Sequence, residues 1–330
     1  MGNPDIDLHL FRDFVLNPTE KAALGAAILG LGRWGIEDVK KPEKKAERRA
    51  ALGRVQASLL ENPELEPFRG LFEHTITHDD SQLTGLVRGI DKRQKKLLIL
   101  IELFFAAPYP ETKHSPGDTL RKKYIAWLGG EMALQPKDYK ELLSAYKGTL
   151  NVHMARRTKI GIGIAAGLAV GAMGGWLVAP ALGGALGAGA GLGGAAAVSH
   201  GLALLGGGAL AAGGAGMAGG IALVTAMGAV GGGLIGLGGT ALLTESGAAQ
   251  VKVDTMKLQM VLAKIVIGDQ QDMAKAQEFA RRQELELQTL RANLVTLKQN
   301  AAENKEKIKN LESIIKTLER AVKWTHKQAN

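Results

Sequence analysis

The sequence predicts an all-α protein with three parts: a helical N-terminal domain, glycine-zipper transmembrane helical hairpins, and a long C-terminal coiled-coil helix. Three observations support this prediction. Apolar residues recur at helical spacing through residues 51–155. Residues 160–244 contain no Asp, Glu, Lys or Arg and are rich in Gly, Ala and Leu. Leucine and isoleucine then follow a heptad pattern to the C-terminus.

The overall composition excludes some classes of function. The 330 residues carry a formal net charge of +9 and include no cysteine, which excludes a disulfide framework and a thiolate site. Basic residues dominate on both sides of the uncharged segment, so both termini are expected on the cytoplasmic side of an inner membrane. No nucleic-acid-binding motif is found, so no nucleic-acid partner is expected. No cofactor is expected either.

Residues 1–50 are interpreted as a basic lead segment before the helical domain. They contain Gly30-Leu31-Gly32-Arg33-Trp34-Gly35, which matches the dinucleotide fingerprint GxGxxG. The fingerprint requires a strand before it and an amphipathic helix after it. Here a Lys- and Arg-rich stretch interrupted by Pro42 follows, so a turn permitted by glycine is the preferred interpretation, with cofactor binding as the alternative.

Residues 51–155 are predicted to form a small helical domain. Leu97 to Phe104 form its most apolar stretch, and Pro108 and Pro110 interrupt the chain afterwards. Asp118 is expected to cap a helix that ends at Gly129-Gly130, and Pro136 to open the last helix of the domain.

One group in this domain could bind a metal: Glu73, His74, His78, Asp79 and Asp80. Two histidines four residues apart share a face of a helix, which is a spacing that zinc and iron sites use. The metalloprotease motif HExxH is absent, because Thr75 follows His74. A solvated loop or helix end is the competing interpretation of His74 and His78.

Residues 156–247 are predicted to be a membrane segment. One crossing needs roughly 20 apolar residues, so the uncharged stretch could supply two or four helices. Glycines spaced four apart would let helix backbones approach closely in a bilayer. A flexible low-complexity tract outside the membrane is the alternative. The predicted packing glycines are Gly163, Gly167, Gly171, Gly175, Gly183, Gly187, Gly191, Gly228, Gly232 and Gly236.

Residues 251–330 begin with an amphipathic helix, Val251 to Ile267, which Gly268 is expected to end. A heptad repeat follows and predicts a rod-like coiled coil that oligomerises the protein, with Asn304 fixing its register. A long helix packed back on the N-terminal domain is the alternative. The predicted seam residues are Leu287, Leu290, Leu294, Leu297, Asn304, Ile308, Leu311, Ile315 and Leu318.

Several stretches carry a resemblance to a known family. They are Arg156-Arg157-Thr158-Lys159-Ile160-Gly161-Ile162-Gly163, Gly174-Gly175-Trp176-Leu177-Val178-Ala179-Pro180, Asp118-Thr119-Leu120-Arg121 and Ile125-Ala126-Trp127-Leu128. Residues 90–245 thereby resemble the front half of the transmembrane and coiled-coil domain protein 4 family. That family continues into a hydrolase-like domain, but this chain has no GxSxG motif, so hydrolase activity is not carried over. Lys96 to Tyr146 is also similar to the helical TerB-like domains of tellurite resistance, without their acidic metal-binding pattern.

Three hypotheses for function follow from these patterns. The first is a non-enzymatic protein that inserts into a membrane, oligomerises and permeabilises it, in the manner of a toxin or an antiviral-defence effector. Its partners would be the lipid bilayer, further copies of the chain and a sensor or partner protein. The second is a membrane-anchored scaffold, without a pore, that recruits a partner through its helical domain and coiled coil. The third is an enzyme that uses Glu73, His74 and His78.

Overall fold

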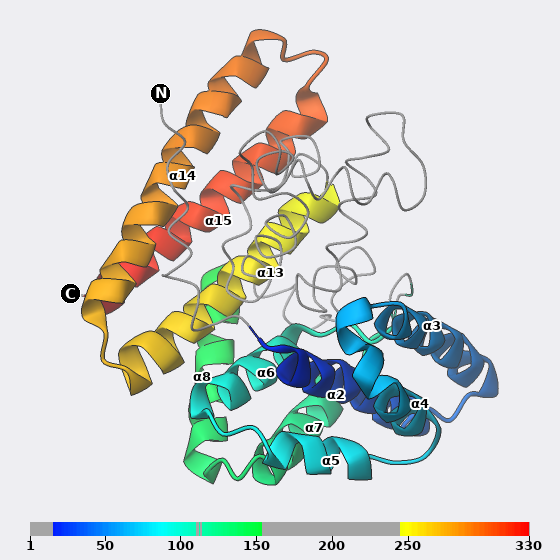
Figure 1. The fold of residues 1–330 in the computed structure, drawn as a ribbon. Helices are drawn as coiled ribbons and strands as arrows, with labels where there is room; N and C mark the ends of the chain where they lie inside the picture. The colour runs from blue at the N-terminus through cyan, green and yellow to red at the C-terminus, as the bar shows by residue number, and fades with distance from the viewer. Residues whose placement is uncertain (1–15, 110–111, 113, 154–244, 330) are drawn as a thin grey trace, which may run out of the picture.

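The computed structural model describes residues 16–109, 112, 114–153 and 245–329, and all the secondary structure in these ranges is helical. The prediction of an all-α fold is therefore confirmed for them. The helices form an N-terminal domain from residue 16 to 153 and a C-terminal part from residue 245 onwards. Figure 1 shows the C-terminal part lying along one side of the N-terminal domain and extending away from it.

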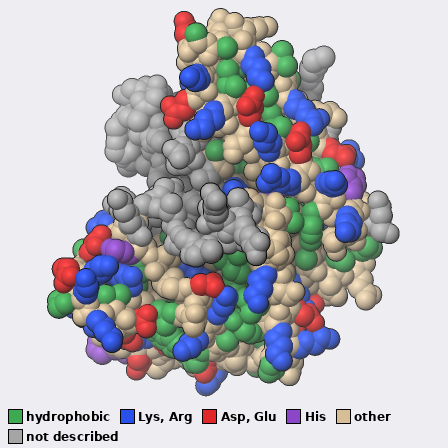
Figure 2. Space-filling view, turned by 180° about the vertical axis from the view of Figure 1, so that it is seen from behind, with side chains coloured by type: hydrophobic (Ala, Val, Ile, Leu, Met, Phe, Trp, Pro, Cys, Tyr) green, Lys and Arg blue, Asp and Glu red, His purple; other side chains and the backbone are tan. Residues whose placement is uncertain are grey.

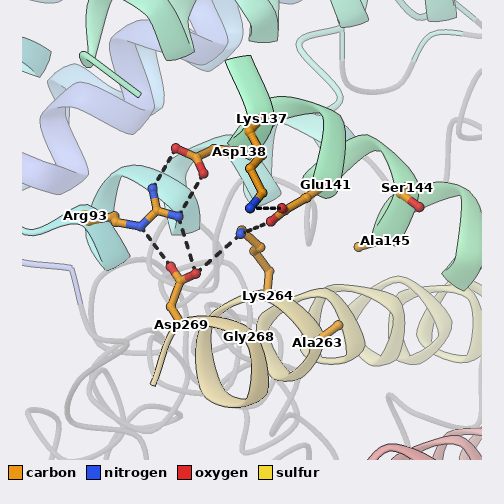
Figure 3. A pocket seen from close by; sticks show the side chains of 10 residues that line it. All are labelled: Arg93, Lys137, Asp138, Glu141, Ser144, Ala145, Ala263, Lys264, Gly268 and Asp269. Carbon is orange, nitrogen blue, oxygen red and sulfur yellow. Dashed lines mark hydrogen bonds and ion pairs between the residues drawn. The ribbon is translucent and has the colours of Figure 1, made fainter. Parts of the chain in front are cut away.

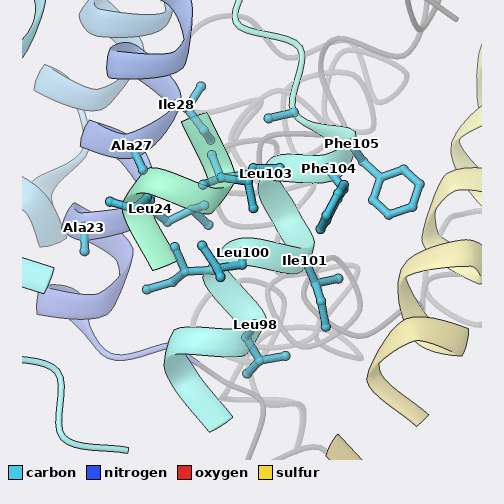
Figure 4. Packing of buried hydrophobic residues seen from close by; sticks show 14 of the residues in the cluster. Ala23, Leu24, Ala27, Ile28, Leu98, Leu100, Ile101, Leu103, Phe104 and Phe105 are labelled. Carbon is cyan, nitrogen blue, oxygen red and sulfur yellow. The ribbon is translucent and has the colours of Figure 1, made fainter. Parts of the chain in front are cut away.

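Helix α2 (Pro18–Glu37) lies at the centre of the N-terminal domain. A capping box starts it, because the Asn17 side chain accepts from the Glu20 amide at 2.9 Å and the Glu20 carboxylate accepts from the Asn17 amide at 2.8 Å. From Ala22 to Leu31 every residue is buried. Ala23, Leu24, Ala27 and Ile28 face the apolar residues of α6 (Arg93–Phe105) in Figure 4. The predicted lead segment thus supplies a core helix.

The glycines of α2 serve close packing and do not form a turn or a cofactor loop. Gly30, Gly32 and Gly35 all lie within the continuous helix, so the turn interpretation and the dinucleotide interpretation are both wrong. A Cβ atom at Gly30 would overlap the Tyr124 hydroxyl, and one at Gly32 would overlap Leu52. The physical reason for the glycines is therefore the short distance between α2 and its neighbours.

Further helices surround α2. They are α3 (Pro42–Leu60), the 3₁₀ turn η1 (Pro63–Phe68), α4 (Arg69–Thr77), α5 (Ser81–Arg88), α7 (Asp118–Glu131) and α8 (Pro136–His153). Pro136 opens α8 as predicted. Helix α7 starts at Asp118 but continues through Gly129-Gly130, where it was expected to end, and Ala133 makes the turn with φ of 56°.

The C-terminal part begins with α13 (Glu245–Val261), which continues into the π-helical segment η5 (Leu262–Asp269). Helix α13 contacts α6 and α8 on one side and α15 (Lys305–Ala329) on the other. From Val251 to Leu262 only Lys252 is not fully buried. Helix α13 therefore joins the N-terminal domain to α14 (Met273–Gln299) and α15.

Helices α14 and α15 form an antiparallel hairpin. Glu284 pairs with His326 at 2.7 Å, Arg291 with Glu319 at 2.6 Å, and Lys298 with Glu312 at 2.9 Å. These pairs follow one another at intervals of seven residues on both helices, which sets a single antiparallel register. The heptad repeat therefore packs one half of the C-terminal region against the other half.

The predicted continuous rod is thus wrong, because residues 300–304 form a turn between α14 and α15. Asn300 ends α14 with φ of −122° and ψ of 55°, and the Asn304 side chain donates to the Asn300 carbonyl at 3.1 Å. Asparagine side chains that bond the local backbone favour turns over helix interiors, which explains the break in an unbroken heptad pattern.

The predicted membrane location and transmembrane helices are contradicted in the part of the chain that the structure describes. No helix within residues 16–109, 114–153 and 245–329 is both long enough and apolar enough to cross a bilayer. The ten predicted packing glycines, from Gly163 to Gly236, lie outside the described residues.

Candidate functional site

Charged side chains gather at the contact between η5 and the ends of α6 and α8. We call it the polar joint and define its outer layer as Arg93, Asp138, Glu141, Lys264 and Asp269. These residues line an open pocket of about 550 Å³, with Lys137 at its edge. Figure 3 shows their side chains converging from α6, α8 and η5.

Arg93 is the centre of the outer layer. It donates two hydrogen bonds to Asp138, at 2.7 and 2.9 Å, and its Nε donates to Asp269 at 3.0 Å. The planar guanidinium binds the Asp138 carboxylate through two N–H groups and keeps a third for Asp269, a bidentate fork that a lysine ammonium does not have. Lys264 adds a second link, since it pairs with Glu141 of α8 and lies 3.4 Å from Asp269.

The local fold explains why these groups meet. Arg93 is the first residue of α6, Asp138 lies in the first turn of α8, and Asp269 is the last residue of η5. Asp138 also accepts from the Gln135 amide at 3.0 Å, which holds its carboxylate in place. The hydrogen bonds from Arg93 lower the pKa of Asp138, and the hydrogen bond from Lys264 lowers the pKa of Glu141.

An inner layer of the polar joint lies between α13 and the helices α6 and α8. Its residues are Glu102, His153, Lys257 and Gln259. The Lys257 ammonium lies 2.6 Å from a Glu102 oxygen, and the two side chains are 0% and 3% exposed. Burial raises the pKa of Glu102, and the charge of Lys257 opposes that shift. The second Glu102 oxygen has no hydrogen-bond partner.

His153 and Gln259 form the second inner contact, with His153 Nε2 and Gln259 Oε1 2.8 Å apart. Because the Gln259 oxygen can only accept, Nε2 carries the proton in this arrangement. Burial lowers the pKa of His153 to about 4, so the ring is neutral near pH 7. His153 Nδ1 and Gln259 Nε2 have no partner.

The polar joint is suited to positioning one part of the chain against another. The outer charges engage one another across three helical segments. The inner layer contains three of the eight buried side-chain atoms without a partner in the described residues. Buried ion pairs cost desolvation and add little net stability, but loss of one partner is costly because it leaves a charge buried without its counterion. The joint therefore lies within an interface that the apolar residues of α13 also form.

The predicted metal candidates, His74 and His78, lie at the C-terminal end of α4. His74 is in its last turn, and His78 is the C-cap, whose backbone amide donates to the His74 carbonyl at 2.9 Å. Their rings stack in parallel, with centroids 4.8 Å apart, and His74 Nε2 lies 3.0 Å from Asp79 Oδ1. In the described ranges no three His, Cys, Asp or Glu residues are grouped to hold a metal ion.

The predicted seam residues lie in the hairpin. Leu287, Leu290, Leu311, Ile315 and Leu318 are buried between α14 and α15. Leu294, Leu297 and Ile308 are partly buried towards the turn, and Asn304 lies at the turn itself. The structure thus brings seven of the nine, all but Asn304 and Ile308, into one apolar cluster within the chain, whereas the prediction placed them between chains.

The polar joint was not among the predicted sites, although the sequence contains a signal for its inner layer. Glu102 interrupts the apolar run from Leu97 to Phe105, and Lys264 interrupts the apolar run from Met260 to Ile267. A single carboxylate in an apolar helix indicates that a cation is buried with it, but Lys257 does not stand out, because Lys252 and Asp254 lie near it in the sequence. Pairing of the two helices still requires the tertiary structure.

Comparison with known proteins identifies no relative: no family model, no curated protein and no solved structure matches this chain. The resemblance described under "Sequence analysis" therefore stays a prediction.

Proposed function

We propose that this protein is a non-catalytic scaffold that recruits a partner protein through two surfaces, the N-terminal helical domain and the α14–α15 hairpin. The polar joint is the observation that supports this proposal. It links η5 to the ends of α6 and α8 through Arg93 and Lys264, so it sets the direction in which the hairpin leaves the domain. A fixed spacing between two binding surfaces is what a scaffold needs.

Figure 1 supports the same proposal, because the hairpin extends beyond the N-terminal domain. Its seam is filled by its own leucines and isoleucines, and its cross-helix ion pairs satisfy part of its charge. The hairpin packs on α13 through α15, and its remaining outer faces can be presented to another molecule.

Photo-crosslinking of the full chain in its native cells tests the proposal. The crosslinking amino acid replaces Val295 of the hairpin, which is 64% exposed, or the exposed Glu73 of α4. A scaffold gives the same crosslinked protein from both positions.

Replacing Arg93 and Lys264 by alanine removes the ion pairs of the outer layer. Crosslinking of the shared partner should then decrease at both positions, Glu73 and Val295. The matched control is Arg88→Ala, which removes a surface ion pair with Glu131 away from the joint. The proposal would be overturned if the two positions crosslinked different proteins. It would also be overturned if the variant without Arg93 and Lys264 crosslinked the partner as well as the wild type does.

A further inference from the structure

Helix α15 carries a line of positive charge along its outward face. The line consists of Lys305, Lys309, Lys316, Arg320, Lys323 and Lys327, and all six are exposed. At 100° per residue these positions fall within about 60° of the helix circumference, and they extend over about 33 Å. The opposite face holds the buried residues Ile314, Leu318 and Ala321. We call these six residues the basic stripe.

The basic stripe is only partly offset by acidic neighbours in the described part of the chain, where Lys316 helps to lower the pKa of Glu312 after the larger effect of Lys298. None of its six members forms an ion pair there, while the acidic residues Glu312 and Glu319 pair with α14. Glu306 lies about 70° to one side of the line. Figure 2 shows blue side chains, with red ones between them, over the upper part of the molecule, where the hairpin lies.

The surroundings of the stripe restrict the kind of partner. Membrane-surface helices place large apolar residues next to their cations, and protein interfaces have an apolar core. Among the described residues the exposed large hydrophobic side chains are Met273 and Val295, and neither belongs to α15. The stripe therefore fits a partner that binds through electrostatic contacts and needs no apolar contact.

We propose that the basic stripe binds the phosphate backbone of a nucleic acid duplex without reading its sequence. Four residues of helix advance about 6 Å, which is close to the distance between phosphates along a strand. The expectation of no nucleic-acid partner rested on missing motifs, but phosphate contacts need only cations and carry no sequence information. This inference goes beyond the scaffold function and does not depend on the polar joint.

Fluorescence anisotropy of the full chain with a labelled 30-base-pair duplex of mixed sequence tests the proposal. Six phosphate contacts predict a slope of log K against log salt of roughly −5. Replacing Lys309, Lys316, Lys323 and Lys327 by Gln should weaken binding in 50 mM KCl at least tenfold and reduce the slope by about 3.5.

The matched control replaces Lys40, Lys41, Lys44 and Arg49 by Gln. These residues are exposed in and before α3, so the net charge falls by the same amount. The control should stay within twofold of the wild type. Equal losses in both variants would show that net charge alone acts and would overturn the proposal, as would no binding by the wild type.

A second arm replaces the duplex by phosphatidylserine vesicles. Stripe-dependent binding that is tighter to the vesicles than to the duplex would overturn the proposal in favour of a lipid surface. Circular dichroism at 222 nm and a thermal melt verify that both variants keep the wild-type fold, which is expected because all eight positions are exposed.

Discussion

Lys257 of α13 and Glu102 of α6 form an ion pair that is closed to solvent, with 2.6 Å between nitrogen and oxygen and at most 3% exposure. The two residues are 155 positions apart in the sequence. The pair joins the C-terminal part of the protein to the core of the N-terminal domain. Its energetic role can be separated from its role in specificity.

Removing one partner should be costly, while removing both should not. Lys257→Met leaves Glu102 buried without its cation, so the free energy of unfolding should fall by about 3 kcal/mol. Lys257→Met combined with Glu102→Leu should return to within about 1 kcal/mol of the wild type, since well-packed apolar residues replace buried ion pairs without loss. Urea unfolding followed by circular dichroism measures both values. A double variant as unstable as the single one would contradict a purely electrostatic origin.

The pH dependence of Lys257→Met provides an independent test of the same pair. Burial already raises the pKa of Glu102 above its ordinary value, and loss of Lys257 raises it further. The folded state then binds more protons than the unfolded state above pH 4.5, so the stability of the variant should fall as the pH rises from 5 to 8. A stability profile parallel to that of the wild type would show that the Glu102 carboxyl has access to water.

His153 should make docking of α13 sensitive to acid. Burial lowers its pKa to about 4, against an ordinary value of 6.5, with smaller effects from the nearby cations Lys252 and Arg320. Between these two pH values the unfolded state binds the extra proton, so stability should be lost as the pH falls from 6.5 to 4. The full shift corresponds to about 3 kcal/mol.

The measurement for His153 is urea unfolding at pH 7 and at pH 5, for the wild type and His153→Gln. The variant should lose less stability than the wild type between these two pH values, because its side chain does not titrate. His78→Gln is the control, since His78 is exposed and lies away from the joint. If both variants follow the wild-type profile, His153 is not held neutral by burial.

Gly30 of α2 should tolerate no side chain. A Cβ atom there would overlap the Tyr124 hydroxyl and lie 2.7 Å from Asp80 Oδ1, and both of these side chains are buried. Gly30→Ala should therefore destabilise the protein by about 1–3 kcal/mol through overpacking. Gly85→Ala in α5 meets nothing within 4 Å and should stabilise by up to about 1 kcal/mol because alanine favours helix. Thermal melts of the two variants measure these effects. Similar melting temperatures would contradict the close approach of Gly30 to the Tyr124 side chain.

The hairpin register predicts a crosslink within one chain. Lys298 and Glu312 form an ion pair at 2.9 Å. The chain has no cysteine, so cysteines introduced at these two positions are the only thiols that can react. A short bismaleimide should then link them within the monomer at every protein concentration. On a denaturing gel the product should migrate as a compact monomer. A ladder of dimers that grows with concentration would indicate the intermolecular coiled coil instead.

Several features were predictable because they depend on local interactions. The all-α class follows from helical periodicity, and the start of α8 at Pro136 follows from the preference of proline for the first turn of a helix. The capping box of Asn17 and Glu20 is likewise local, since both residues lie within one turn. The heptad repeat correctly predicts which faces of α14 and α15 are apolar.

Features that involve two distant helices were not predictable from these patterns. The glycines of α2 suggested a turn because glycine permits many backbone conformations, and only Tyr124 and Leu52 packed against them explain a helix. His74 and His78 have metal-site spacing, but a metal site also needs ligands from elsewhere in the fold, and no group of three metal-binding side chains occurs in the described ranges. Asn300 and Asn304 allow the heptad pattern to fold back on itself.

Local patterns in the sequence predict the helical class, the apolar faces and the single carboxylate Glu102 within an apolar stretch. The tertiary structure adds that Glu102 meets Lys257, that Arg93 holds both Asp138 and Asp269, and that the heptad leucines pack within one chain. Periodicity and capping act over one or two turns of a helix. The choice of partner depends on burial and charge pairing between segments that the sequence keeps far apart.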